Sequence, residues 1–225
     1  MPSRFGKILT AACLAGASTV GAIAFAPVAH ASSAVTDHLA PENTTVALSE
    51  PAAGFLTMNI DNNFVNFTVS CTTVTMSFPI GPTGSFQLGS LLPQGDGQPV
   101  DFRSCTDDLG GNDTIVTAGN WTANFKDAKT GDTEPNTDKV VLHLPSNAMT
   151  LQTSAIGGCV LTFNPGTAIS NLAAGYNDKG TATIKAGTSF GTVAPSGASC
   201  PFTSVTETND SDHLKASVAF HDVVS

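Results

Sequence analysis

The stretch Phe64-Val65-Asn66-Phe67-Thr68-Val69-Ser70-Cys71-Thr72-Thr73-Val74-Thr75-Met76-Ser77-Phe78 alternates apolar and polar residues over almost its whole length. Alternation with a period of two is typical of a β-strand that buries one face, so this stretch predicts a long strand. From Val65 to Cys71 its apolar residues occupy odd-numbered positions, and from Val74 to Phe78 they occupy even-numbered positions. Because a one-residue shift would turn the core face toward solvent, we expect a β-bulge or a bend near Thr72 and Thr73.

Shorter runs of the same kind recur on both sides of this stretch. They are rich in Thr, Val, Ile and Phe and are bounded by Gly, Pro, Asn or Asp. They predict strands at 43–48, 55–60, 85–89, 98–104, 113–118, 120–125, 140–144, 148–154, 158–163, 181–186, 199–206 and 214–221. The one helical turn that the pattern allows lies at 168–174. Many short strands separated by turn residues predict an all-β, antiparallel β-sandwich, either immunoglobulin-like or jelly-roll-like.

Residues 1–31 carry the pattern of a secretory signal peptide. Two basic residues, Arg4 and Lys7, precede an apolar stretch without Asp, Glu, Lys or Arg that ends in Ala29-His30-Ala31, with small residues at the two positions that a signal peptidase reads. A membrane anchor is the first alternative, but small residues and Pro27 interrupt the stretch, and a spanning helix needs about 20 strongly apolar residues.

A second alternative is a lipoprotein modified at Cys13. Cleavage there would leave only a short apolar segment before the cysteine, whereas the apolar stretch continues well beyond it. We therefore expect an exported protein, secreted or associated with the cell envelope, with no transmembrane segment in the mature chain 32–225.

The mature chain is acidic. Cleavage would remove two of the 9 basic residues, and seven basic residues against 18 acidic ones give a formal net charge of −11. Such a chain repels phosphate backbones, so nucleic-acid binding is not expected. The polar stretch 126–138 separates two portions that would permit two packed sub-sandwiches. We favour one domain with 126–138 as an acidic surface loop or linker, because each half alone would have a thin core.

The cysteines agree with export. Without Cys13 the chain keeps an even number of cysteines, which in an exported protein predicts disulfides: Cys71, Cys105, Cys159 and Cys200. A zinc site would need closely spaced pairs such as C-x-x-C, and these cysteines are too far apart in the sequence. Three pairings are open, and we favour Cys71–Cys105 and Cys159–Cys200, which join neighbours along the chain.

Several of these features occur together in a known class of proteins. A signal peptide is followed by Thr68-Val69-Ser70-Cys71-Thr72-Thr73, Arg103-Ser104-Cys105, a lone Trp121, Gly158-Cys159 and a late Cys200 before a final strand. This layout resembles secreted, β-rich actinobacterial proteins of unassigned function that contain disulfides. The resemblance implies an extracellular β-sandwich, and it implies no activity.

One motif suggests catalysis. Gly187-Thr188-Ser189-Phe190-Gly191 matches the G-x-S-x-G nucleophile elbow, and an acid (Asp210 or Asp212) and a histidine (His213 or His221) follow it, as in a serine hydrolase. The elbow needs a helix directly after the serine, and residues 192–197 do not favour one. We therefore interpret the motif as a turn between strands.

Two acidic segments suggest calcium. Asp132, Glu134, Asn136 and Asp138 place oxygen atoms at every second position, and a second group surrounds Gly110-Gly111: Asp107, Asp108, Asn112 and Asp113. Calcium binds six to eight oxygen ligands. The first segment lacks the central glycine and the closing bidentate Glu of a calcium loop. The second segment half resembles one calcium-binding β-roll repeat, but such sites form between stacked repeats and this chain has one copy. The residues of both are ordinary turn formers, so we favour solvated loops.

These observations predict a secreted or envelope-associated, non-enzymatic binding or structural module whose partner is unknown. No cofactor, no metal and no catalytic residue is assigned. The histidines after residue 31 are too dispersed to predict a metal site. The alternatives are a secreted serine hydrolase that uses Ser189 with His213 or His221, and a calcium-stabilised, adhesin-like module.

Overall fold

The structure is a computed structural model, and it describes residues 37–50, 56–62, 65–126, 138–177 and 179–224. The predicted signal peptide 1–31 lies outside the described residues. So does most of the acidic stretch 126–138, including Asp132, Glu134 and Asn136 of the first calcium candidate.

The predicted long strand is present as β4 (Val65–Ile80), and its buried side chains change phase at Thr72 and Thr73 as the sequence predicts. The pairing partner β6 (Val100–Asp107) changes phase opposite this point, where Ser104 has a φ of 50°. Both strands contribute the same number of residues on each side of the irregularity. The irregularity is therefore not a β-bulge, because neither strand carries an extra residue.

The strand β4 is the branch point of the sheet, because its two halves have different neighbours. Its first half pairs with β3 (Leu56–Asn62) and its second half pairs with β2 (Thr44–Ser49). The change of phase lets one continuous strand bury opposite faces in these two surroundings. All the strand pairings that the structure describes are antiparallel, as predicted: no helix occurs in the described ranges.

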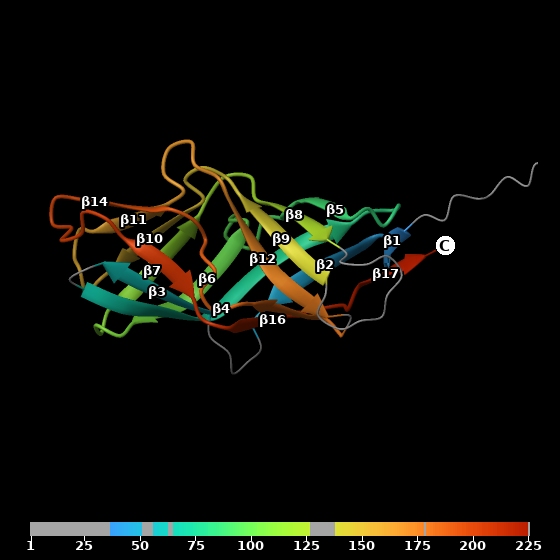
Figure 1. Cartoon of the computed structure of the whole chain (residues 1–225), viewed down its shortest axis with the longest axis horizontal. Coiled ribbons are helices and arrows are strands. Elements are labelled where there is room, and N and C mark those ends of the chain that lie inside the picture. Colours follow the sequence, from blue (N-terminus) through green and yellow to red (C-terminus); the bar gives the residue numbers. More distant parts are fainter. Residues whose placement is uncertain (1–36, 51–55, 63–64, 127–137, 178, 225) are drawn as a thin grey trace, which may run out of the picture. The chain divides into compact units, whose positions relative to one another are not determined.

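The other strands extend from β4 in two directions. One run continues from β6 through β7 (Asn112–Thr117), β10 (Met149–Thr153), β11 (Val160–Phe163) and β14 (Val193–Ser196). The second continues from β2 through β16 (Asp212–Ala216), β13 (Thr181–Ile184), β12 (Ser170–Asn177), β9 (Asp138–Leu144), β8 (Thr122–Lys126) and β5 (Gln87–Ser90). The strand β15 (Thr206–Asn209) pairs with β3, and β1 (Asp37–Ala40) with β17 (His221–Val224) forms a separate two-stranded ribbon. Figure 1 shows β14 and β11 at one end of the view and this ribbon at the other.

The first run of strands curls back until its last strand, β14, meets β15, which is connected to β4 through β3. The strands β14 and β15 both lie at edges of the sheet, and one isolated bridge, Val193 to Val205, joins them. We call this junction the β14–β15 seam. The structure describes one bridge between these two strands and no continuous ladder.

Aromatic side chains fill the interior in separate groups. One group contains Phe102, Phe163 and Phe190. A larger group packs edge-to-face and stacked inside the second run of strands: Phe78, Phe86, Phe125, Tyr176 and Phe220. Trp121 is buried, as predicted, and its indole N–H donates to Ala118 O at 3.1 Å. Residues 35–225 form one compact unit.

Both predicted disulfides are present. Cys71–Cys105 links directly opposed residues of β4 and β6, and Cys159–Cys200 links the start of β11 to the segment before β15. The strands predicted between 43 and 186 occur with small changes at their ends. In the part of the chain that is described, no helix is long and apolar enough to span a membrane.

Three predictions of secondary structure are wrong. The predicted helical turn at 168–174 is the beginning of β12, whose alternate residues Leu172, Ala174 and Tyr176 are buried between β9 and β13. The predicted strand 199–206 is not formed before Val205, because the segment contains Pro201, which lacks an N–H for a ladder. The predicted strand 214–221 is divided into β16 and β17.

Candidate functional site

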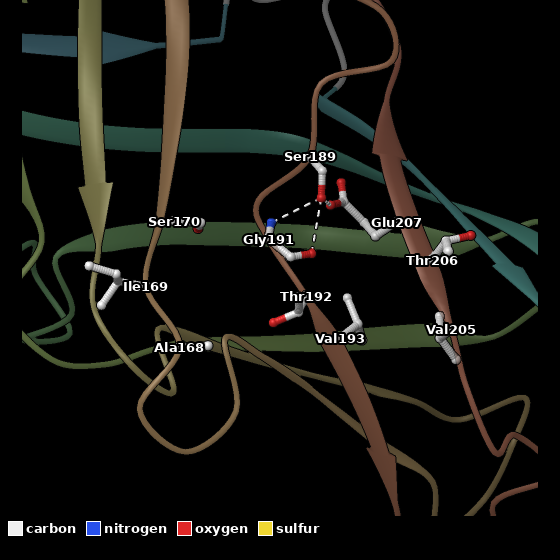
Figure 2. Close-up of a pocket in the computed structure, with 10 residues that line it drawn as sticks. All are labelled: Ala168, Ile169, Ser170, Ser189, Gly191, Thr192, Val193, Val205, Thr206 and Glu207. Carbon is white, nitrogen blue, oxygen red and sulfur yellow. Dashed lines mark hydrogen bonds between the residues drawn. The ribbon is translucent and has the colours of Figure 1, made fainter.

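A cleft of about 570 Å³ lies beside the β14–β15 seam. Three segments line it, as Figure 2 shows: the start of β12, the chain leading into β14, and the beginning of β15. Its lining residues are Ala168, Ile169, Ser170, Ser189, Gly191, Thr192, Val193, Val205, Thr206 and Glu207. Ser189, the serine of the G-x-S-x-G motif, therefore lies in a cleft. The motif that positions it is a turn between strands and not a nucleophile elbow.

The motif forms a tight turn between β13 and β14. Gly187 and Gly191 have φ values of 80° and 132°, a region that glycine enters without steric strain. A Cβ on Gly191 would also lie 1.9 Å from Asn164 Oδ1, so no side chain fits there. No helix follows the motif in the described chain, and β14 begins at Val193. The geometry of the turn explains both glycines without catalysis.

This turn is fastened to β15 by backbone and side-chain hydrogen bonds. Gly187 N–H donates to Asn209 O at 2.8 Å, and Asn209 N–H donates to Thr188 O at 2.7 Å. On the other side, Ser170 Oγ donates to Phe190 O at 2.5 Å. The turn is therefore held from both walls of the cleft.

Glu207 is the partner of Ser189. Its Oε2 accepts hydrogen bonds from Ser189 Oγ and from Phe190 N–H, both at 2.8 Å, and Gly191 N–H donates to Ser189 Oγ at 2.9 Å. Glu207 is only 3 % exposed, and its Oε1 has no partner. Burial raises the pKa of Glu207 to about 7, although the two hydrogen bonds act in the opposite direction.

The acids and histidines proposed as partners of Ser189 are engaged elsewhere. His213 Nδ1 lies 3.0 Å from Thr183 Oγ1 on the exposed face of β16, and His221 lies on β17 opposite Ala40. Asp210 accepts from the Asn59 side chain, and Asp212 accepts from Thr57 N–H. Within the described residues, Ser189 forms no hydrogen bond with either histidine of the alternative hydrolase hypothesis.

The walls of the cleft combine exposed apolar and polar groups. Ile169 is 79 % exposed at the rim, and Val193 is half-buried on the opposite wall. A smaller hollow of about 210 Å³ shares Val205 and Thr206 with the cleft and is lined in addition by Asp61, Asn62 and Ser204. The smaller hollow therefore lies beside the same part of β15 and is lined by an acidic residue.

A third hollow of about 160 Å³ shares Ile169 and Ser170 with the cleft. His143, which lines it, bridges two strands: its Nε2 lies 3.0 Å from Asn124 Nδ2, and its Nδ1 lies 2.5 Å from Asn171 Oδ1. Both ring nitrogens are thus engaged by amide side chains, and this arrangement holds the surface of β8, β9 and β12 together.

The second calcium candidate is assembled only in part. Asp107 Oδ1 accepts from Gly111 N–H at 2.6 Å and its Oδ2 is bonded by Thr153 Oγ1, while Asp108 caps Thr68 N–H at 3.0 Å. Asp113 lies close to Asp107, and burial, with a contribution from this neighbour, raises its pKa to about 6. The exposed Asn112 side chain takes no part.

Asp138, the one described residue of the first calcium candidate, is buried. Among the described residues, no three His, Cys, Asp or Glu side chains are grouped to hold a metal ion.

Two important residues of the cleft were not recognised in the sequence. Glu207 lies in Thr206-Glu207-Thr208-Asn209, where the buried face is polar and the exposed face carries threonine. A search for alternating apolar residues therefore does not detect β15, nor the burial of Glu207. The sequence pattern predicts a helical turn that includes Ile169, whereas in the structure Ile169 directly precedes β12 and is exposed.

Comparisons with known proteins give no match, since no family model, no curated protein and no solved structure is similar to this chain. The function must therefore be inferred from the geometry of the cleft and from the chemistry of its lining.

Proposed function

We propose that this chain is an exported, non-enzymatic binding module whose ligand occupies the cleft beside the β14–β15 seam. The observation that carries the proposal is the exposure of Ile169 at the rim of a cleft of about 570 Å³. Ligand sites are concave, measure about 300–1,000 Å³ and combine apolar walls with a few polar groups. Contact with a ligand would remove this apolar surface from water, which is favourable.

The hydrogen bonding of Ser189 favours binding over catalysis. A serine nucleophile needs a base and free donors that stabilise the developing oxyanion. Here the hydroxyl donates to Glu207, and the nearby Gly191 N–H is directed at Ser189 Oγ itself. These groups stabilise the turn, and we assign them a structural role.

Two disulfides are compatible with an extracellular protein and support the proposal of export. The finer fold, an immunoglobulin-like or jelly-roll-like sandwich, stays a prediction, because one curled sheet supplies most of the strands around the core.

The proposal is tested with the mature protein and a library of small fragments observed by NMR. We expect binding to shift the amide signals of 168–170, 189–193 and 205–207. Ile169→Asp should abolish these shifts, because it places a charge on the apolar rim. Val218→Asp, which changes another exposed apolar residue outside the cleft lining, should leave them unchanged. Absence of bound fragments, or shifts elsewhere on the surface, would contradict a ligand site in the cleft.

A second function, a serine hydrolase, is supported by one observation. Ser189 Oγ lies 2.8 Å from a carboxylate whose pKa is raised to about 7, so Glu207 could act as its base. A fluorophosphonate reagent distinguishes the two functions. The binding proposal expects no covalent mass increase, whereas a hydrolase would be labelled in the parent protein and not in Ser189→Ala.

A further inference from the structure

The turn 187–191 forms part of one wall of the cleft, and hydrogen bonds at two places hold it on β15. The start of the turn exchanges backbone hydrogen bonds with Asn209. Farther along, Ser189 Oγ and Phe190 N–H both donate to Glu207 Oε2 at 2.8 Å, and Figure 2 shows the first of these bonds. On this side, the part of the turn that lines the cleft is therefore attached through the Glu207 carboxyl group.

This carboxyl group is buried in surroundings that favour its neutral form. Glu207 is 3 % exposed, and its Oε1 has no hydrogen-bond partner. An ionised carboxylate loses its hydration when it is buried, and here only Oε2 receives hydrogen bonds in return. The docked turn is therefore most stable while Glu207 carries a proton.

The charged residues on the surrounding elements are exposed or paired with one another. In the described chain β3 contributes Asp61, and Lys185 and Asp210 flank the turn and β15; all three are exposed. Asp101 and Arg103 flank the β6 residue that packs on the turn, and they form an ion pair at 2.6 Å. The strands β11, β12 and β14 contain no Asp, Glu, Lys, Arg or His. No described side chain therefore supplies a charge that would stabilise the carboxylate in the docked turn.

We propose that protonation of Glu207 controls the cleft: the turn stays docked on β15 while the carboxyl group is neutral, and it is released when the group is ionised. Release lets the carboxylate reach water and removes Ser189 and Gly191 from the wall of the cleft. The ligand should therefore bind together with a proton, more tightly in acid than in base. This regulation rests on the proposed binding function of the cleft.

The pKa of Glu207, which burial raises to about 7, gives the pH at which the change should occur. Because this pKa lies above that of an exposed glutamate, the docked turn holds the proton more tightly than the released turn. Docking is therefore favoured at low pH and weakens as the pH rises through 7.

The first test follows the mature protein by NMR from about pH 5.5 to about pH 8.5. The amide signals of Ser189, Phe190 and Gly191 should move with a midpoint near pH 7. Protection of the Phe190 amide from hydrogen exchange, corrected for the base-catalysed rate of an unstructured chain, should fall at least about tenfold over this range. Amides of β4 serve as the reference. If the signals move while the protection of Phe190 stays constant, Glu207 ionises without releasing the turn and the inference is wrong.

A neutral variant separates the carboxyl group from other effects of pH. Glu207→Gln has no charge in this range and keeps an oxygen for both donors, so its Phe190 amide should stay protected throughout. Glu42→Gln, which removes an exposed carboxyl group and changes the net charge equally, should behave like the parent protein. Parent-like pH dependence in Glu207→Gln would contradict the inference.

Fragments that bind the cleft connect the turn to the ligand. Their affinity for the parent protein should be at least about tenfold weaker at about pH 8.5 than at about pH 6, and in Glu207→Gln it should be the same at both. Equal affinities in the parent protein would overturn the inference and leave the proposed function intact. If no fragment binds at either pH, the proposed function fails, and the exchange of Phe190 alone decides whether the turn is released.

Discussion

At the scale of single residues, the two glycines of Gly187-Thr188-Ser189-Phe190-Gly191 differ in their surroundings. Both have positive φ, but a Cβ on Gly187 would have no atom within 4 Å, whereas one on Gly191 would overlap Asn164 Oδ1. Gly187→Ala should therefore lower the free energy of unfolding by about 1–2 kcal/mol, from backbone strain alone. Gly191→Ala adds steric overlap and should lower it by about 2–5 kcal/mol. Urea denaturation of both variants measures the difference.

The two variants serve as controls for each other, because both substitutions add the same methyl group to the same turn. Equal losses in the two variants would show that Asn164 moves away without penalty. A larger loss at Gly187 would contradict the packing beneath Gly191.

Glu207 shows which kind of residue a single sequence does not reveal. The motif that contains Ser189 is recognisable, but its partner lies eighteen positions later in a strand whose buried residues are polar. Burial of an acid depends on hydrogen bonds from Ser189 and Phe190, and these contacts exist only after the turn has docked. The sequence therefore identifies Ser189 as a candidate site residue, but it does not identify Glu207 as its hydrogen-bond partner.

At the scale of elements, prediction succeeded where alternation is strong. The change of phase within β4 was visible because large apolar residues mark both of its faces. The strand β12 was not predicted, because Ala173, Ala174 and Gly175 are small and leave the alternation faint. The edge strand β14 was also missed, since Pro195 and the flanking glycines are typical of turns.

The two disulfides differ in the burial of their cysteines, and this difference predicts their order of reduction. Cys71 and Cys105 are buried in the centre of paired strands, whereas Cys200 is half-buried in a segment outside the strands. Increasing reductant should open Cys159–Cys200 first, and loss of this link, with 41 residues of separation, should destabilise the protein by about 4 kcal/mol. Alkylation followed by peptide mass mapping identifies the order. Earlier opening of Cys71–Cys105 would contradict the prediction.

At the scale of the whole molecule, four acidic side chains have pKa values that are raised above their usual range. Burial is the largest cause that raises the pKa of Glu50 and Glu207 to about 7, and that of Asp113 and Asp212 to about 6. A raised pKa means that the folded state binds these protons more tightly than the unfolded state. Their contribution to stability is complete below the unfolded pKa of about 4 and is lost as the pH rises through 6 and 7.

The urea midpoint should therefore fall between about pH 4 and about pH 7, and the excess of acidic residues acts in the same direction through charge repulsion. Glu207→Gln and Glu50→Gln should each flatten this dependence, because each removes one carboxyl group whose proton is held more tightly in the folded state. Glu42→Gln removes an exposed carboxyl and changes the net charge equally, so it separates repulsion from burial. If the midpoint rises with pH, or if all three variants flatten the profile equally, the four acids with raised pKa values do not control stability.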